Sequence, residues 1–212
     1  MKPGDRREAF ERARLYLVAP GDFPVDVLGA VIEAGVDLVQ LRMKDAEAAE
    51  VIEVADQFQG VCEAARVPFV INDRPDIALA LAADGVHLGQ DDLAPIVARE
   101  ILGPDVMIGR STHSTDDVTR ALEEHEHGLA DYIAVGPVHQ TPTKAGRPAV
   151  GLELVAHAAQ HVTFPWFAIG GINISTLSNV VKTGGRRIVV VRAIVESDDP
   201  VRAASELSGE LS

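Results

Sequence analysis

Length, composition and charge limit what this chain can be. Its 212 residues suffice for one well-buried core and are few for two independent domains, so we expect residues 1–212 to form a single domain. The formal net charge of −13 argues against nucleic acid or an anionic membrane as a partner, although a local cluster of cations can still bind a phosphorylated small molecule. Cys62 is the only cysteine, and the sequence has no signal peptide pattern and no apolar run long enough to span a membrane, so we expect a cytoplasmic location.

Eight short apolar or β-branched segments follow one another along the chain and are typical of strands. They are residues 15–19, 37–42, 68–72, 84–88, 106–110, 131–135, 165–169 and 187–191. The stretches between them have helical periodicity; after the second segment, for example, apolar residues recur every three or four positions from Ala48 to Cys62. Residues 1–14 are expected to form a leading helix. Alternating strands and helices predict parallel strands joined by helical crossovers.

Eight such units in this length predict an α/β fold with a single (β/α)8 TIM barrel and a short extra N-terminal helix. A doubly wound open sheet is the alternative, but it usually has fewer strands in a chain of this size and a glycine-rich first turn. The first expected strand is instead followed by Pro20-Gly21-Asp22, which is not a dinucleotide-binding fingerprint. In TIM barrels the functional residues gather at the carboxyl ends of the strands.

Two aspartates follow neighbouring expected strands and suggest a metal site. Asp73 comes just after the third strand and Asp92 just after the fourth. Two carboxylates held close together repel each other, and a magnesium ion with one or two protein carboxylates, phosphate oxygens and water as ligands removes that repulsion. The alternative is that each aspartate caps the helix that follows it. Because Lys44 and Ser111 lie nearby, we expect Asp73 and Asp92 to bind one magnesium ion per site.

Positive charge is placed where a diphosphate would need it. The chain has four lysines, and two of them, Lys44 and Lys144, follow expected strands. With Arg42 and Ser111 they supply the charge and the hydroxyl that a diphosphate needs, so we predict these four residues as catalytic. His87, within the fourth strand, is expected to contact the substrate.

Two loops later in the chain are expected to bind substrate. The long loop of residues 136–151 carries Thr141 and Thr143, and loops of this length in compact barrels are often lids. Gly170 and Gly171 follow the seventh strand, where barrels frequently bind a phosphate through backbone amides.

The order of these motifs resembles the thiamine phosphate synthase family over roughly residues 15–203. The combination of QLRMK, HLGQDD and TPTK is far more specific than any one of the three. The resemblance implies an enzyme that joins hydroxymethylpyrimidine diphosphate to a thiazole phosphate and releases diphosphate with the help of magnesium. Its partners would then be these two small molecules, with no nucleic acid and no membrane involved.

The resemblance also implies a role for each matching residue. For the pyrimidine diphosphate they are Gln40, Leu41, Arg42, Met43, Lys44 and Asn72, with Ser111 and Lys144 on its diphosphate; for magnesium, Asp73 and Asp92; and for the thiazole phosphate, Thr141, Thr143, Gly171, Val191 and Arg192. The sequence departs from the family pattern at Arg192, where members often have serine, and at Ala19-Pro20, where they often have threonine and aspartate. The arginine leaves the contact to phosphate at that position in question.

Two alternative functions remain open from the sequence. A thiazole tautomerase on the same barrel would bind the thiazole phosphate but would need neither the aspartate pair nor the cations. A non-catalytic barrel that sequesters a phosphorylated ligand would be expected to keep Gly170-Gly171 and to lose Asp73, Asp92 or Lys144. The sequence leaves the oligomeric state open.

Overall fold

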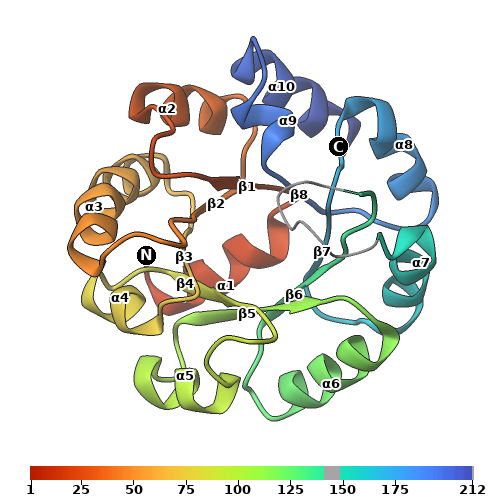
Figure 1. The fold of residues 1–212 in the computed structure, drawn as a ribbon, viewed down its shortest axis with the longest axis horizontal. Coiled ribbons are helices and arrows are strands. Elements are labelled where there is room, and N and C mark those ends of the chain that lie inside the picture. The colour runs from red at the N-terminus through yellow and green to blue at the C-terminus, as the bar shows by residue number, and fades with distance from the viewer. Residues whose placement is uncertain (141–148, 212) are drawn as a thin grey trace.

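The fold is a closed barrel of eight parallel strands surrounded by helices, as the computed structural model shows for residues 1–140 and 149–211 (Figure 1). The strands are β1 (Leu15–Ala19), β2 (Leu38–Leu41), β3 (Phe69–Asn72), β4 (Gly85–Leu88), β5 (Met107–Thr112), β6 (Tyr132–Val135), β7 (Trp166–Ile169) and β8 (Ile188–Val190). Each strand pairs with the next in sequence, and β8 pairs with β1 to close the ring. The predicted (β/α)8 barrel is confirmed.

Except for the first, which precedes β1, the helices follow the strands around the outside of this ring (Figure 1). They are α1 (Pro3–Arg12), α2 (Val25–Glu33), α3 (Ala48–Ala65), α4 (Pro75–Ala80), α5 (Pro95–Leu102), α6 (Thr115–Glu126), α7 (Gly151–His161), α8 (Ile174–Lys182), α9 (Arg192–Val195) and α10 (Pro200–Glu210). Pro75 and Pro95 open α4 and α5, where a helix tolerates proline because its first amide has no partner within the helix. Within the described part of the chain, no helix is both long enough and apolar enough to cross a membrane.

Side chains alternate between two cores along each strand. In β1, Leu15, Leu17 and Ala19 pack against the surrounding helices, whereas Tyr16 and Val18 point into the barrel. This alternation decides which strand residues can reach a ligand at the rim.

Helix α1 closes the amino-terminal end of the barrel, behind the strands in Figure 1. Phe10 of this helix is completely buried, and its ring centroid lies 5.3 Å from that of Tyr132. Arg6 Nε donates a hydrogen bond of 2.9 Å to Asp84 Oδ1 just before β4. The predicted leading helix therefore serves as a plug, and the carboxyl ends of the strands form the open rim.

Candidate active site

A first pocket of about 380 Å³ opens at the carboxyl ends of the strands. It contains nine of the predicted site residues. Val191 follows β8, and the other eight come from four consecutive strands and the turns after them: Gln40, Arg42, Lys44, Asn72, Asp73, His87, Asp92 and Ser111. Residues separated by about seventy positions in the sequence thus line one cavity. The structure extends β5 to Thr112, so Ser111 is part of a strand, where the sequence had placed it just after one.

The two aspartates form a hydrogen-bonded pair in this pocket. Burial, a hydrogen bond to Asp92 and the charge of Asp92 raise the pKa of the Asp73 carboxyl to about 6, and Lys44 opposes this shift. A hydrogen bond between two carboxyl groups requires a proton between them, so the pair is a site where a divalent cation can replace that proton. Two carboxylates with phosphate oxygens and water are a ligand set that magnesium accepts. The Asp73–Asp92 pair therefore fits magnesium.

The capping alternative for these aspartates is wrong. Helix α4 begins after Arg74 and helix α5 after Ala94, and neither N-terminus receives a side-chain cap. Asp92 Oδ2 instead accepts a hydrogen bond of 2.6 Å from the amide of Gly89, which tightens the turn after β4. Within residues 1–140 and 149–211, three or more acidic, histidine or cysteine side chains do not gather in a metal-binding group. A metal here would take its remaining ligands from substrate and water.

The backbone of Asp73 is held in the left-handed region, with φ of +61°. Its amide donates a hydrogen bond of 2.9 Å to the carbonyl oxygen of His87 on the neighbouring strand. Such a conformation costs on the order of 1 kcal/mol in a residue other than glycine and is most common at functional sites. Aspartate and asparagine tolerate it better than other side chains do.

Two cations line the same pocket. Arg42 and Lys44 follow β2, and within the described residues neither side chain forms an ion pair or a hydrogen bond with another residue. Their charge is therefore available to an anionic ligand.

Leu41 and Met43 were also predicted to contact the pyrimidine diphosphate, but their side chains do not line this pocket. Leu41 is 1% exposed and packs in the core between the strands and the helices, as alternation along β2 requires. Met43 packs against that same core and covers the backbone of Gly21. At these two positions the backbone is what remains for a ligand.

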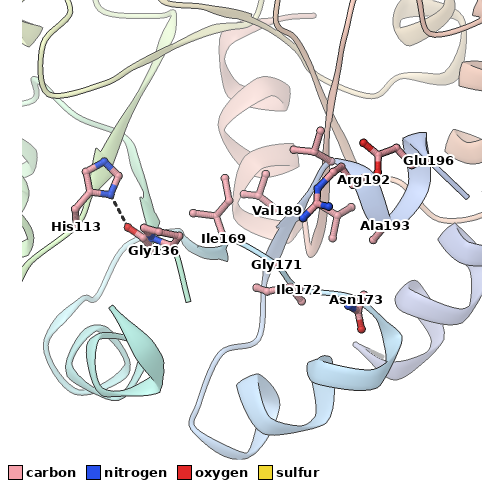
Figure 2. A pocket seen from close by; sticks show the side chains of 14 residues that line it. His113, Gly136, Ile169, Gly171, Ile172, Asn173, Val189, Arg192, Ala193 and Glu196 are labelled. Carbon is pink, nitrogen blue, oxygen red and sulfur yellow. Dashed lines mark hydrogen bonds between the residues drawn. The ribbon is translucent and has the colours of Figure 1, made fainter. Parts of the chain in front are cut away.

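A second pocket of about 320 Å³ lies at the ends of β7 and β8 (Figure 2). It is lined by the predicted residues Gly171, Val191 and Arg192, and it shares His113, Ile169, Val189 and Val191 with the first pocket. The two cavities adjoin, so ligands in both would touch.

The glycine pair after β7 shapes the second pocket. Gly170 has φ of +106° and Gly171 φ of +64°, a region that glycine enters without strain. A Cβ atom on Gly171 would lie 2.7 Å from Cβ of His139, so no larger residue fits there. Asn173 then caps α8, its side chain accepting a hydrogen bond of 2.9 Å from the amide of Ser175.

Arg192 is one of the residues that line the second pocket. It is the first residue of the short helix α9, and its side chain extends toward Val189 in Figure 2. Barrels of this class frequently bind phosphate with the loops after strands seven and eight and the start of a short extra helix. Arg192 lies at this position, and its contact to a phosphate stays a prediction.

Sequence reasoning missed the residues that support the site from beneath. Arg110 is buried, pairs with Glu124 at 3.0 Å and donates to the carbonyl oxygen of Gly89 at 2.6 Å, which fixes the turn that carries Asp92. Tyr16 and Tyr132 point into the barrel, and Tyr16 also lines the first pocket. Their inward phase on β1 and β6 is the one signal in the sequence that identifies them.

The predicted site residues Thr141, Thr143 and Lys144 lie outside the described residues.

Comparison with known proteins agrees with these features. A family described as thiamine monophosphate synthase matches residues 15–194. The thiamine-phosphate synthase of Acidothermus cellulolyticus is 49% identical over 94% of this chain and 95% of its own length. That of Thermus thermophilus is 47% identical over 93% of this chain and 97% of its own length. A longer relative of the same name from Nostoc is 42% identical, and the chain covers 58% of it.

Solved structures show the same relationship. Thiamine phosphate pyrophosphorylase from Pyrococcus furiosus superposes with a TM-score of 0.83 at 34% identity, covering 95% of this chain and 98% of that one. A 3-hexulose-6-phosphate synthase superposes with a TM-score of 0.68 at 19% identity, covering 94% of this chain and 100% of that one, and shares the fold alone. The chain belongs to the thiamine monophosphate synthase family.

Proposed function

We propose that this chain is a thiamine-phosphate synthase, which transfers the pyrimidinylmethyl group of hydroxymethylpyrimidine diphosphate to the nitrogen of a thiazole phosphate and releases diphosphate. One observation carries the proposal: two adjoining pockets on one rim, the first with a carboxylate pair and available cations, the second with a backbone suited to a phosphate. Neither alternative function needs both. A tautomerase has no use for the first pocket, and a sequestering barrel has no use for Asp73, Asp92 and Lys44 together.

The first pocket is assigned to the pyrimidine diphosphate. Gln40, Asn72 and His87 line this pocket and would hold the ring, while Arg42, Lys44 and Ser111 would hold the diphosphate. Lys144, outside the described residues, is proposed to join them. As the bond to the methylene carbon breaks, charge grows on the leaving oxygen, and preorganised cations stabilise that charge more than they stabilise the ground state.

The proposed cofactor is one magnesium ion bound by Asp73 and Asp92. The close carboxyl pair and its raised proton affinity support this assignment. When bound, the ion would neutralise the diphosphate and make it a better leaving group.

The second pocket is assigned to the thiazole phosphate. The backbone at Gly171 and Val191 and the side chain of Arg192 would bind its phosphate, with Thr141 and Thr143 from the loop outside the described residues. Because the pockets share Ile169 and Val189, the thiazole nitrogen would face the methylene carbon of the other substrate. Both substrates are small phosphorylated molecules, so the proposed location is the cytoplasm, without nucleic acid or membrane as partner.

We propose that the bond to diphosphate breaks before the thiazole nitrogen attacks. The amino-substituted pyrimidine can stabilise the resulting cation, and the pocket supplies cations and hydrogen-bond donors around the leaving group. A trifluoromethyl group in place of the ring methyl should then slow turnover by several powers of ten, each factor of ten being about 1.4 kcal/mol of barrier. If the modified substrate binds normally and turns over within a few-fold of the natural one, displacement is direct.

The function itself is tested by measuring both products. The purified protein is given both substrates with magnesium, or with EDTA in place of magnesium, and thiamine phosphate and diphosphate are quantified. We expect equal amounts of the two products with magnesium and none without it. Consumption of the thiazole phosphate alone would indicate a tautomerase, and binding without any product would indicate a sequestering barrel.

A further inference from the structure

A chain of hydrogen bonds crosses the inside of the barrel, and four of its five residues line the first pocket. Gln40 Nε2 donates to Tyr16 Oη, which lies 3.1 Å from Tyr132 Oη. Tyr132 Oη lies 3.3 Å from His87 Nδ1, and His87 Nε2 lies 3.0 Å from Ser111 Oγ. The chain thus links two residues assigned to the substrate, Gln40 and Ser111, through a phenol that does not line the pocket, Tyr132.

The amide of Gln40 determines which atom donates and which accepts in every hydrogen bond of this chain. The amide nitrogen of Gln40 can only donate, so Tyr16 accepts there and its own proton is left for Tyr132. Tyr132 accepts this hydrogen bond and donates its own to Nδ1 of His87. A neutral imidazole that accepts at Nδ1 carries its proton on Nε2 and donates it to Ser111.

Both phenols keep their protons, as this direction requires. Tyr16 and Tyr132 are 1% and 0% exposed. Burial raises the pKa of each hydroxyl above its ordinary value of 10, so neither ionises near neutral pH. The phenol rings are also fixed by packing, since Tyr132 contacts Phe10 and Phe167 with ring centroids 5.3 and 6.0 Å apart.

We propose that Tyr132 and Tyr16 are positioning residues that hold His87 with its proton on Nε2 and thereby turn the hydroxyl proton of Ser111 into the first pocket. Ser111 accepts from His87, so its own proton points to an anionic ligand there. This inference rests on the proposed function, in which that ligand is the leaving diphosphate. It also assigns His87 a role different from that of a base that activates Ser111, since a base would need an unprotonated Nε2.

The opposite direction is a distinct arrangement with a distinct consequence. If the amide of Gln40 were turned, its oxygen would accept from Tyr16, and every bond in the chain would reverse. His87 would then carry its proton on Nδ1, and the hydroxyl of Ser111 would donate its hydrogen bond to Nε2. A serine oxygen without an outward proton repels a diphosphate, so only the first direction suits the site.

The test is the protonation of His87 in the resting protein, measured by ¹⁵N NMR of imidazole-labelled protein at neutral pH. We expect the proton on Nε2 in the wild type. We expect Tyr132→Phe, which keeps the ring contacts and loses the hydroxyl, to leave a mixture of the two tautomers. Phe10→Leu, which touches the same ring and has no polar atom, is the matched control and should leave the His87 signals unchanged. A wild-type proton on Nδ1, or unchanged signals in Tyr132→Phe, overturns the proposal.

A kinetic cycle checks that Tyr132 acts through Ser111. Tyr132→Phe should lower kcat about tenfold, the scale of one hydrogen bond, with the KM of the thiazole phosphate unchanged. Ser111→Ala should lower kcat further, and adding Tyr132→Phe to it should change kcat less than about twofold, because the path is already broken. Additive losses would contradict the proposal. The wild-type spectrum decides the direction even if a variant fails to fold, and it does not depend on activity, so a failure of the proposed function would be seen separately as absence of product.

Discussion

At the scale of single residues, Asp73 concentrates the unusual physical chemistry of this site. It is partly buried, hydrogen-bonded to a second carboxyl and held at φ of +61°. Each of these features costs stability in the metal-free protein, and a cation bound between the two carboxylates would remove the electrostatic part of the cost. The residue is thus arranged for a ligand rather than for folding.

Magnesium affinity should depend on pH through this carboxyl. The pKa of Asp73 is about 6, so below pH 6 a proton occupies the pair and the metal must displace it. We expect the affinity measured by titration calorimetry to rise between pH 5 and pH 7 and to level off above. Asp73→Asn should bind magnesium weakly at every pH and lower turnover, as should Asp92→Asn. An affinity independent of pH in the wild type would contradict the metal assignment.

The same rise in the pKa of Asp73 predicts that Asp73→Asn is more stable than the wild type at high pH but not at low pH. Because the folded pKa of Asp73 is raised from 3.8 to about 6, its contribution to stability is fully present below pH 3.8 and is lost as the pH rises through 6. Asp73→Asn should therefore have a higher Tm than the wild type at pH 7.5 without magnesium and no advantage at pH 4. Asparagine suits the left-handed backbone as well as aspartate does, so the comparison isolates the charge. Thermal unfolding in EDTA measures it, and a lower Tm for the variant at pH 7.5 would contradict the account.

At the scale of elements, the turn between β7 and α8 is defined by backbone conformation. Gly171→Ala places a methyl group 2.7 Å from His139 Cβ at φ of +64°. We expect a loss of about 1 kcal/mol or more of stability and a roughly tenfold higher KM for the thiazole phosphate. Gly60→Ala is the control, since Gly60 lies within α3 with open space around it, and should stabilise by about 0.5–1 kcal/mol without affecting either KM. An unchanged thiazole KM in Gly171→Ala would remove the glycine pair from the phosphate site.

The strands show how far sequence reasoning reaches at this scale. Period and turn chemistry located all eight, and the residues at their carboxyl ends do converge on one rim. The direction in which each strand side chain points was harder to predict than the position of the strand. Leu41 was predicted as a contact because resemblance transfers whole motifs, whereas alternation along β2 turns its side chain into the outer core. Tyr132 was missed because its hydroxyl meets partners from β1 and β4 that only the register of the barrel brings together.

At the scale of the whole molecule, the residues that stabilise the barrel and the residues of the candidate active site lie at opposite ends. Helix α1 fills the amino-terminal end, and the two pockets occupy the carboxyl-terminal rim. Phe10→Ala should lower the free energy of unfolding by about 3–5 kcal/mol, since it opens a cavity under Tyr132. Both KM values should stay within a few-fold of the wild type at temperatures where the variant is folded. Denaturant unfolding and steady-state kinetics measure the two effects, and a large KM change without loss of stability would contradict this division.

The central claim is that the two pockets hold different substrates side by side, and the KM of each substrate in two arginine variants tests it most directly. Arg42→Ala removes a cation from the first pocket, and Arg192→Ala removes one from the second. We expect Arg42→Ala to raise the KM of the pyrimidine diphosphate about tenfold or more and to leave that of the thiazole phosphate unchanged, with the reverse for Arg192→Ala. If both variants raise the KM of the same substrate, the assignment of the two pockets is wrong.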